Sequence, residues 1–215
     1  SGLVAYYPFD GNASDISGNG YDGTVDGATL GADRQGNASM AYNFDGVDDR
    51  IKIGDQALNG QNHFTFSMWL KTVSGDQFLV TAANASRDNE FLFWIDNELK
   101  FHHSGGGQKT FSNYSATSWA NSWIFLTFTN DATNTEGKLW VNGELKDTVT
   151  ISSNTLDVDN NGLWLGGDQD TVGGGWQSSQ TYEGTIDEVR IYNRVLSSNE
   201  IVMLFNYKNY AIDPT

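Results

Sequence analysis

A loop at residues 10–23 gathers the oxygen-bearing side chains of Asp10, Asn12, Asp15 and Asn19. Its glycines let the backbone turn tightly, so that side-chain and carbonyl oxygens can converge on one point. Calcium in proteins takes roughly six to eight such oxygens, from carboxylates, amides and backbone carbonyls. The loop lacks the Gly and Glu spacing of an EF-hand, so its residue types predict a calcium site of another kind.

A further carboxylate, Asp187, lies in the run 184–197, where Ile186 and Val189 favour a strand. A carboxylate among apolar neighbours needs a partner. We therefore expect Asp187 to hold a cation shared with the first loop. The alternative is that the Asp and Asn side chains of that loop only cap turns, through hydrogen bonds to nearby backbone N–H groups.

A second acidic cluster, Asp168 and Asp170, precedes three glycines at 173–175 and then Trp176. Glycines have no side chain to pack, so this stretch predicts a mobile loop that presents an exposed indole. Such an indole can stack on a sugar ring while carboxylates accept hydrogen bonds from its hydroxyls. The alternative is that Trp176 folds back onto the core as a lid. Arg87, in another polar stretch, could line the same rim, unless that stretch is only a solvated loop.

Two further candidates for glycan contact lie on expected strands. Simple alternation places Trp94 and His102 on the face opposite to Phe91 and Phe93. If the phenylalanines face the core, Trp94 and His102 can line a groove on the outer face. A zinc site at His102 and His103 is not expected, because adjacent strand residues point to opposite faces and no third ligand stands at metal spacing.

No catalytic pattern is found in the sequence. Some glucanases carry paired catalytic carboxylates on one face of a strand, in a Glu-x-Asp-x-x-Glu pattern. Glu183, Asp187 and Glu188 do not have that spacing. A Gly-x-Ser-x-Gly elbow, a His-Glu-x-x-His motif and a phosphate-binding glycine loop are all missing. We therefore do not expect an enzyme.

The composition excludes several classes of partner. The 215 residues contain 27 Asp and Glu against 12 Lys and Arg, a formal net charge of −15, which disfavours nucleic acids and anionic membranes. There is no cysteine, and no apolar run reaches the roughly 18 residues of a membrane span. The acidity suits a saline or calcium-containing medium outside the cell; the alternative is that it serves only solubility. A basic start before an apolar core is also lacking, so that, if the protein is exported, we expect this chain to be a mature form or an excised module.

The elements that must position these residues are mostly strands. Short segments rich in β-branched and aromatic residues recur from end to end, with 24 Gly and only two Pro, and no compositional break marks a linker. The pattern predicts one all-β domain over residues 1–215, a two-sheet antiparallel jelly-roll sandwich. We expect a hairpin at 41–53 and tight turns at 96–98 and at Asn142-Gly143. A short C-terminal helix begins at Ser197 or Ser198.

With these residues in view, the chain resembles the LamG-like jelly-roll domains of the concanavalin A-like lectin and glucanase superfamily. The matching pieces span nearly the whole chain: VAYYPFDG at 4–11, DISGNG at 15–20, YNFDGVDD at 42–49, FTFSMW at 64–69, WIFLTF at 123–128, LWVNG at 139–143 and GTIDEVRIYNRVL at 184–196. The resemblance implies a carbohydrate- or protein-binding module of a secreted enzyme or bacterial adhesin. It also implies a structural calcium that joins the first loop to Asp187.

Together these features predict a non-catalytic, calcium-stabilised, lectin-like module of a larger extracellular or cell-surface protein. Its partners would be a glycan or polysaccharide and neighbouring modules of the same protein. An interaction domain for proteins is the main alternative, and a glycan-active enzyme is a more distant one. The sequence leaves open which sugar is bound and whether a second calcium lies in the ligand site.

Overall fold

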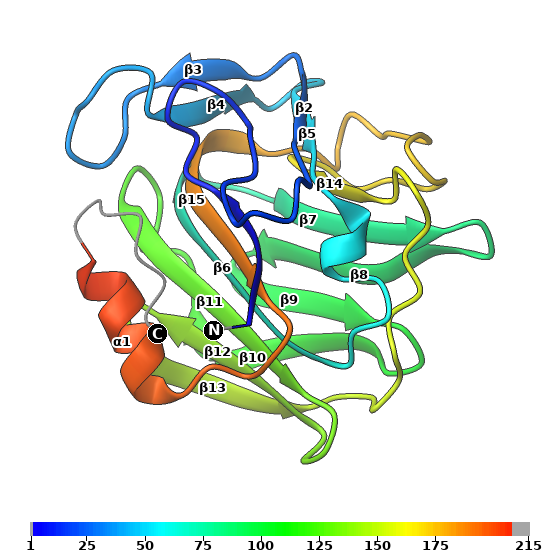
Figure 1. The fold of residues 1–215 in the computed structure, drawn as a ribbon. Coiled ribbons are helices and arrows are strands. Elements are labelled where there is room, and N and C mark those ends of the chain that lie inside the picture. The colour runs from blue at the N-terminus through cyan, green and yellow to red at the C-terminus, as the bar shows by residue number, and fades with distance from the viewer. Residues whose placement is uncertain (1, 208–215) are drawn as a thin grey trace.

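The computed structural model describes residues 2–207, which form two packed antiparallel sheets and one short helix (Figure 1). One sheet has the strand order β13-β12-β11-β6-β15-β4-β3, with β1 paired to β15, and the other has the order β10-β9-β8-β7-β14-β5-β2. The strands are β1 Leu3–Tyr7, β2 Thr24–Asp26, β3 Thr29–Gly31, β4 Ala41–Asp45, β5 Arg50–Lys52, β6 His63–Thr72, β7 Gln77–Asn84, β8 Arg87–Asp96, β9 Glu98–His103, β10 Gly107–Ser115, β11 Trp123–Asp131, β12 Glu136–Val141, β13 Glu144–Thr150, β14 Leu163–Leu165 and β15 Glu183–Tyr192. This arrangement confirms the jelly-roll sandwich.

Aromatic residues from both sheets fill the core. Phe91 and Phe93 of β8 and Phe101 of β9 are buried and meet Phe128 of the opposite sheet, with ring centroids 4.8 Å apart for Phe101 and Phe128. Alternation along the strands therefore sends these phenylalanines inward, as expected. Their strand neighbours are left for the outer face.

The prediction of a hairpin at 41–53 is wrong. β4 pairs with β15 and β3 in one sheet, whereas β5 pairs with β14 and β2 in the other. The turn between them carries the chain from one sheet to the other, so Phe44 and Ile51 reach the core from different layers. Alternation gives the inward face of each strand, but it does not show which strand pairs with which. The turns at Asn97 and at Asn142-Gly143 do connect neighbouring strands, and both asparagines have positive φ.

The closing strand β15 holds the two chain ends together. Its first half pairs with β4 and its second half with β1, while β6 lies along its other edge. A bulge interrupts the β6 pairing between Asp187 and Arg190, where the neighbour changes from β4 to β1. Bulges re-aim side chains and recur next to functional sites. Asp187 and Glu188 occupy this irregular point.

Helix α1, Ser198–Asn206, follows the closing strand. Ser197 is its N-cap and forms a reciprocal capping box with Glu200, which confirms the expected start. The helix covers Trp69 and Phe125 on the outer face of the larger sheet. Among the described residues, no helix is long and apolar enough to cross a membrane.

Candidate metal centre and ligand groove

The carboxylate of Asp187 is buried, with 2% of the residue exposed. Its Oδ2 lies 3.5 Å from Nη1 of Arg34, whereas its Oδ1 is buried without a hydrogen-bond partner. Burial, followed by the negative charge of Glu188, raises the pKa of Asp187 to about 8. An ionised Asp187 therefore needs more positive charge nearby than Arg34 supplies.

Glu188 and Asp33 act electrostatically on both Asp187 and Asp10, and we call Asp10, Asp33, Asp187 and Glu188 the acidic clasp. The pKa of Asp10 is raised by burial and by the charges of Glu188 and Asp33, and Glu188 and Asp33 also act on Asp187. Glu188 is already engaged, because its Oε2 accepts a hydrogen bond from Tyr6 Oη at 2.8 Å and pairs with Arg190 Nη2 at 2.5 Å.

The backbone beside the clasp is strained. Phe9, directly before Asp10, has φ 58°, and Glu188, directly after Asp187, has φ 55°. Residues with a Cβ rarely adopt this left-handed conformation, and where they do the surrounding structure enforces it, often at functional sites. The strain lies beside the two carboxylates that the sequence placed in a shared site.

The other predicted ligands, Asp15, Asn12 and Asn19, form hydrogen bonds with nearby backbone groups, as the turn-capping alternative expects. Asp15 is buried, and although burial opposes it, hydrogen bonds from the backbone N–H groups of Tyr6, Ser17 and Tyr21 lower the pKa of this carboxyl. Asn12 Oδ1 accepts a hydrogen bond from the N–H of Ser14 at 2.8 Å.

Asn19 is anchored in the same way, since its Nδ2 donates to the carbonyl of Val4 at 2.9 Å. Metal ligation by Asn12, Asp15 and Asn19 stays a prediction. Asp33, which the sequence did not single out, is an electrostatic neighbour of both Asp10 and Asp187.

The clasp has the donor chemistry of a hard divalent cation. A buried carboxylate oxygen without a hydrogen bond and an exposed carboxylate at the start of the first loop are oxygen donors that calcium prefers. Asp10 and Asp187 are therefore the residues of the predicted set that fit best. Among the described residues, a group of three carboxylates with oxygens within 4.8 Å of one another occurs elsewhere, at Asp45, Asp48 and Asp49, but Asp45 and Asp49 cap their own turn.

At the turn between β7 and β8 lies an open groove with a volume of about 510 Å³. We call it the rim groove, and its walls are Asn84, Ala85, Ser86, Arg87, Asp170, Thr171 and Val172. The structure thus brings Arg87 and Asp170 to one rim, as the sequence suggested. A second open groove of about 300 Å³ shares Asn84, Ser86 and Arg87 and adds the buried Glu90.

Asp168 is buried and is not among the residues that line the rim groove. It is 3% exposed and accepts hydrogen bonds from Thr81 Oγ1 and Gln180 Nε2, each at 3.2 Å. The Oε1 of Gln180 is buried without a hydrogen-bond partner. Asp170 is half-buried, and its Oδ2 accepts from Gln177 Nε2 at 2.5 Å. No pattern in the sequence pointed to Gln180, because its role depends on the fold of the whole loop.

Trp176 is half-buried, which corrects the expected mobile and exposed indole. Its ring packs edge-to-face on Trp164 at 5.3 Å, and the guanidinium of Arg50 lies 4.2 Å from the ring centroid. Aromatic and cation–π contacts of this kind hold the ring in one orientation. Trp176 thus packs on Trp164 of β14.

Trp94 and His102 face away from the core phenylalanines, as expected, and both are half-buried. Trp94 stacks on Phe78 with ring centroids 6.3 Å apart. Trp94 lies on β8 roughly 20 Å beyond Arg87 at the rise of an extended strand. The structure therefore does not bring Trp94 into the rim groove.

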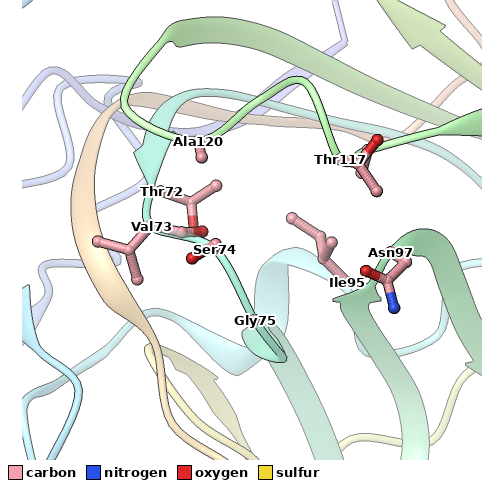
Figure 2. A pocket seen from close by; sticks show the side chains of 9 residues that line it. Thr72, Val73, Ser74, Gly75, Ile95, Asn97, Thr117 and Ala120 are labelled. Atoms are coloured by element: carbon pink, nitrogen blue, oxygen red, sulfur yellow. The ribbon is translucent and has the colours of Figure 1, made fainter.

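A third recess lies beside the turn between β8 and β9 (Figure 2). Ile95, Val73 and Ala120 contribute apolar groups, and Thr117 and Asn97 stand at its edge. Its volume is about 90 Å³, against about 510 Å³ for the rim groove. Ligand pockets generally begin at roughly 300 Å³, so the rim groove is the better candidate.

Comparison with known proteins assigns the family. Residues 45–202 match the family model described as the concanavalin A-like lectin/glucanases superfamily. Mouse serum amyloid P-component is 26% identical over 176 residues, which is 77% of this chain and 73% of the mouse protein. The chain therefore belongs to the concanavalin A-like lectin/glucanases superfamily.

Solved structures show the same fold. Domain 4 of AbnA, an extracellular GH43 arabinanase from Geobacillus stearothermophilus solved with arabinotriose, has a TM-score of 0.70 and 21% identity, covering 95% of this chain and 98% of that one. The ligand-binding domain of botulinum neurotoxin serotype D, solved with N-acetylneuraminic acid, has a TM-score of 0.71 and 17% identity, covering 95% of this chain and 50% of that one. At these identities the likeness shows the fold alone.

Proposed function

We propose that this member of the superfamily is a non-catalytic glycan-binding module and that its ligand occupies the rim groove. The observation that carries the proposal is the meeting of Arg87 and Asp170 at the groove of about 510 Å³. A guanidinium donates and a carboxylate accepts, so the pair can hold neighbouring sugar hydroxyls in a fixed orientation. A groove of this size has room for a short oligosaccharide and is open to a longer chain.

Trp176 lies on the same loop as Asp170 but outside the residues that line the rim groove, and we propose that its indole extends the binding surface. A half-buried indole keeps one part of its ring accessible while its packing on Trp164 and Arg50 fixes its position. A pre-oriented ring stacks on a sugar with little loss of conformational entropy. Similar structures solved with arabinotriose and with N-acetylneuraminic acid are consistent with a glycan ligand.

Calcium belongs to the proposal as a stabilising ion at the acidic clasp, held by Asp10 and Asp187. A cation bound only by the folded state stabilises it by mass action. A second calcium in the rim groove is also a candidate, because the carboxylate of Asp170 on its wall is a hard oxygen donor.

The clasp does not support glycan hydrolysis. Asp187 is paired with Arg34, and Glu188 is held by Tyr6 and Arg190, so neither is arranged as a free acid or nucleophile at an open cleft. As its setting we propose a larger extracellular or cell-surface protein, such as an adhesin, in which this chain is a binding module. The alternative within this class is a module that binds a protein.

A glycan array probed with the protein, with and without calcium, tests the proposal. Binding should fall at least roughly tenfold for Trp176→Ala and for Arg87→Ala, since each removes one main contact. Glu144→Gln, an exposed substitution on β13, is the matched control and should bind as wild type. Silence of the wild type on the array, or full binding by both alanine variants, would contradict the proposed groove.

A further inference from the structure

Arg34 joins three parts of the molecule that are distant in sequence. Its Nη1 lies 3.5 Å from Oδ2 of Asp187, and its guanidinium carbon lies 4.5 Å from the ring centroid of Trp69 on β6. Its Nη2 donates to the carbonyl of Tyr207, the residue that caps the end of α1. Only 10% of the Arg34 side chain is exposed, so these contacts are sheltered from water.

The clasp leaves Arg34 as the partner of Asp187. Arg190, the other buried arginine nearby, is taken up by Glu188 at 2.5 Å and by the ring of Tyr6 at 3.9 Å. Arg34 reaches only one oxygen of Asp187, while Oδ1 is buried without a hydrogen bond. Arg34 thus pairs with one oxygen of the Asp187 carboxylate, and the other oxygen is left to bind a second cation.

We infer that Arg34 is the resident counter-cation of Asp187 and that it competes with the divalent cation for this carboxylate. The inference rests on the proposed calcium site at the clasp. A divalent ion on Oδ1 repels a guanidinium held on Oδ2 of the same group. Arg34 can yield, because the ring of Trp69 and the carbonyl of Tyr207 remain as partners. One of these partners, Tyr207, is the C-cap of α1. A shift of Arg34 when a cation binds to the clasp therefore changes the contacts at the end of this helix.

Calcium titration and thermal unfolding of the full chain test this competition, using Arg34→Gln against wild type. In EDTA, Arg34→Gln should melt at a lower temperature, because Asp187 loses its counter-charge. In calcium chloride, its rise in melting temperature should exceed that of wild type, and its calorimetric Kd for calcium should be lower by on the order of tenfold. Amide exchange at residues 204–207 should respond to calcium in wild type and not in Arg34→Gln.

Three controls separate charge from packing. Arg34→Lys keeps the charge and should keep the calcium affinity of wild type. Arg34→Met keeps an aliphatic contact with Trp69 and should behave as Arg34→Gln, and it replaces that variant if the glutamine does not fold. Arg194→Gln removes a guanidinium that pairs with Glu200 outside the clasp, so it should leave the calcium response unchanged.

The outcomes distinguish this inference from the proposed calcium site. Equal calcium affinity in wild type and in the Arg34→Gln or Arg34→Met variant would overturn the competition and leave the site in place. A calcium response in the variant alone would overturn the proposal that calcium stabilises the native chain, and it would support the competition. No response in either protein would overturn both, while glycan binding at the rim groove is measured separately on the array.

Discussion

The acidic clasp and the rim groove are both rich in carboxylates, but they are built differently. In the clasp, Asp187 and Glu188 are buried and each faces a guanidinium, from Arg34 and Arg190. At the groove, Asp170 accepts a hydrogen bond from the neutral and exposed amide of Gln177. A buried charge pair resists the loss of either partner, whereas an exposed amide can be exchanged for a sugar hydroxyl.

The two regions also differ in where their residues come from. The clasp draws on both ends of the chain, and β1 and β15 lie side by side across the larger sheet, whereas the β7–β8 turn projects from another part of the molecule (Figure 1). The groove lies on one turn and one loop. The comparison indicates that the clasp stabilises the fold and that the groove is free to vary with the ligand.

The largest expected effect comes from breaking a charge pair in the clasp. Glu188→Ala should lower the free energy of unfolding by about 3–5 kcal/mol, because it leaves the buried Arg190 without its carboxylate. Urea unfolding followed by tryptophan fluorescence measures the loss. Asp170→Ala, the matched change at the groove, should cost less than about 1 kcal/mol. Equal losses in the two variants would remove the distinction between the regions.

Removal of calcium should separate the regions next. In excess EDTA we expect the wild-type melting temperature to fall by several degrees, since the native state loses a bound ligand. Asp187→Asn should show little further change with EDTA, while Asp170→Asn should retain most of the shift. Calorimetric melting curves with and without EDTA provide the measurement. A full EDTA shift in Asp187→Asn would place the stabilising ion elsewhere.

A substitution at the rim groove should lower the affinity for glycan and leave the thermal stability unchanged. Asp170→Asn keeps the shape of the side chain but removes its charge, so affinity for an array-identified glycan should fall roughly tenfold, about 1.4 kcal/mol. The melting temperature in EDTA should stay within about one degree of wild type, because the group is half-buried and faces the groove. Titration calorimetry with that glycan is the test, and unchanged affinity would move the ligand away from Asp170.

The smallest effect concerns a carboxylate outside both regions. Hydrogen bonds from Arg194, which act with the capping contacts to Ser197, lower the pKa of Glu200 from 4.5 to about 2. A lowered folded-state pKa stabilises the protein above pH 4.5, and this contribution is lost as the pH falls toward about 2. Glu200→Gln should cost about 1 kcal/mol at pH 7 and less at pH 2. Urea unfolding at both pH values checks the sign, and an equal cost at both would contradict it.

Local chemistry in the sequence was enough for much of the fold. Alternation predicted the inward phenylalanines of β8 and the outward Trp94, and Asn142-Gly143 predicted a tight turn because both residues accept positive φ. Ser197 and Glu200 predicted the start of α1. Each of these features depends on residues a few positions apart, so a short window of sequence contains the cause.

Tertiary structure alone decided the partners. It assigned β4 and β5 to different sheets, laid Trp176 on Trp164, and surrounded Asp187 with Arg34 and Glu188. The sequence identified Asp187 as a buried acid in need of a positive charge, but the charge came from a loop far away in the chain. Burial and electrostatic pairing depend on distances between remote segments, and those distances exist only after the two sheets have closed around the core.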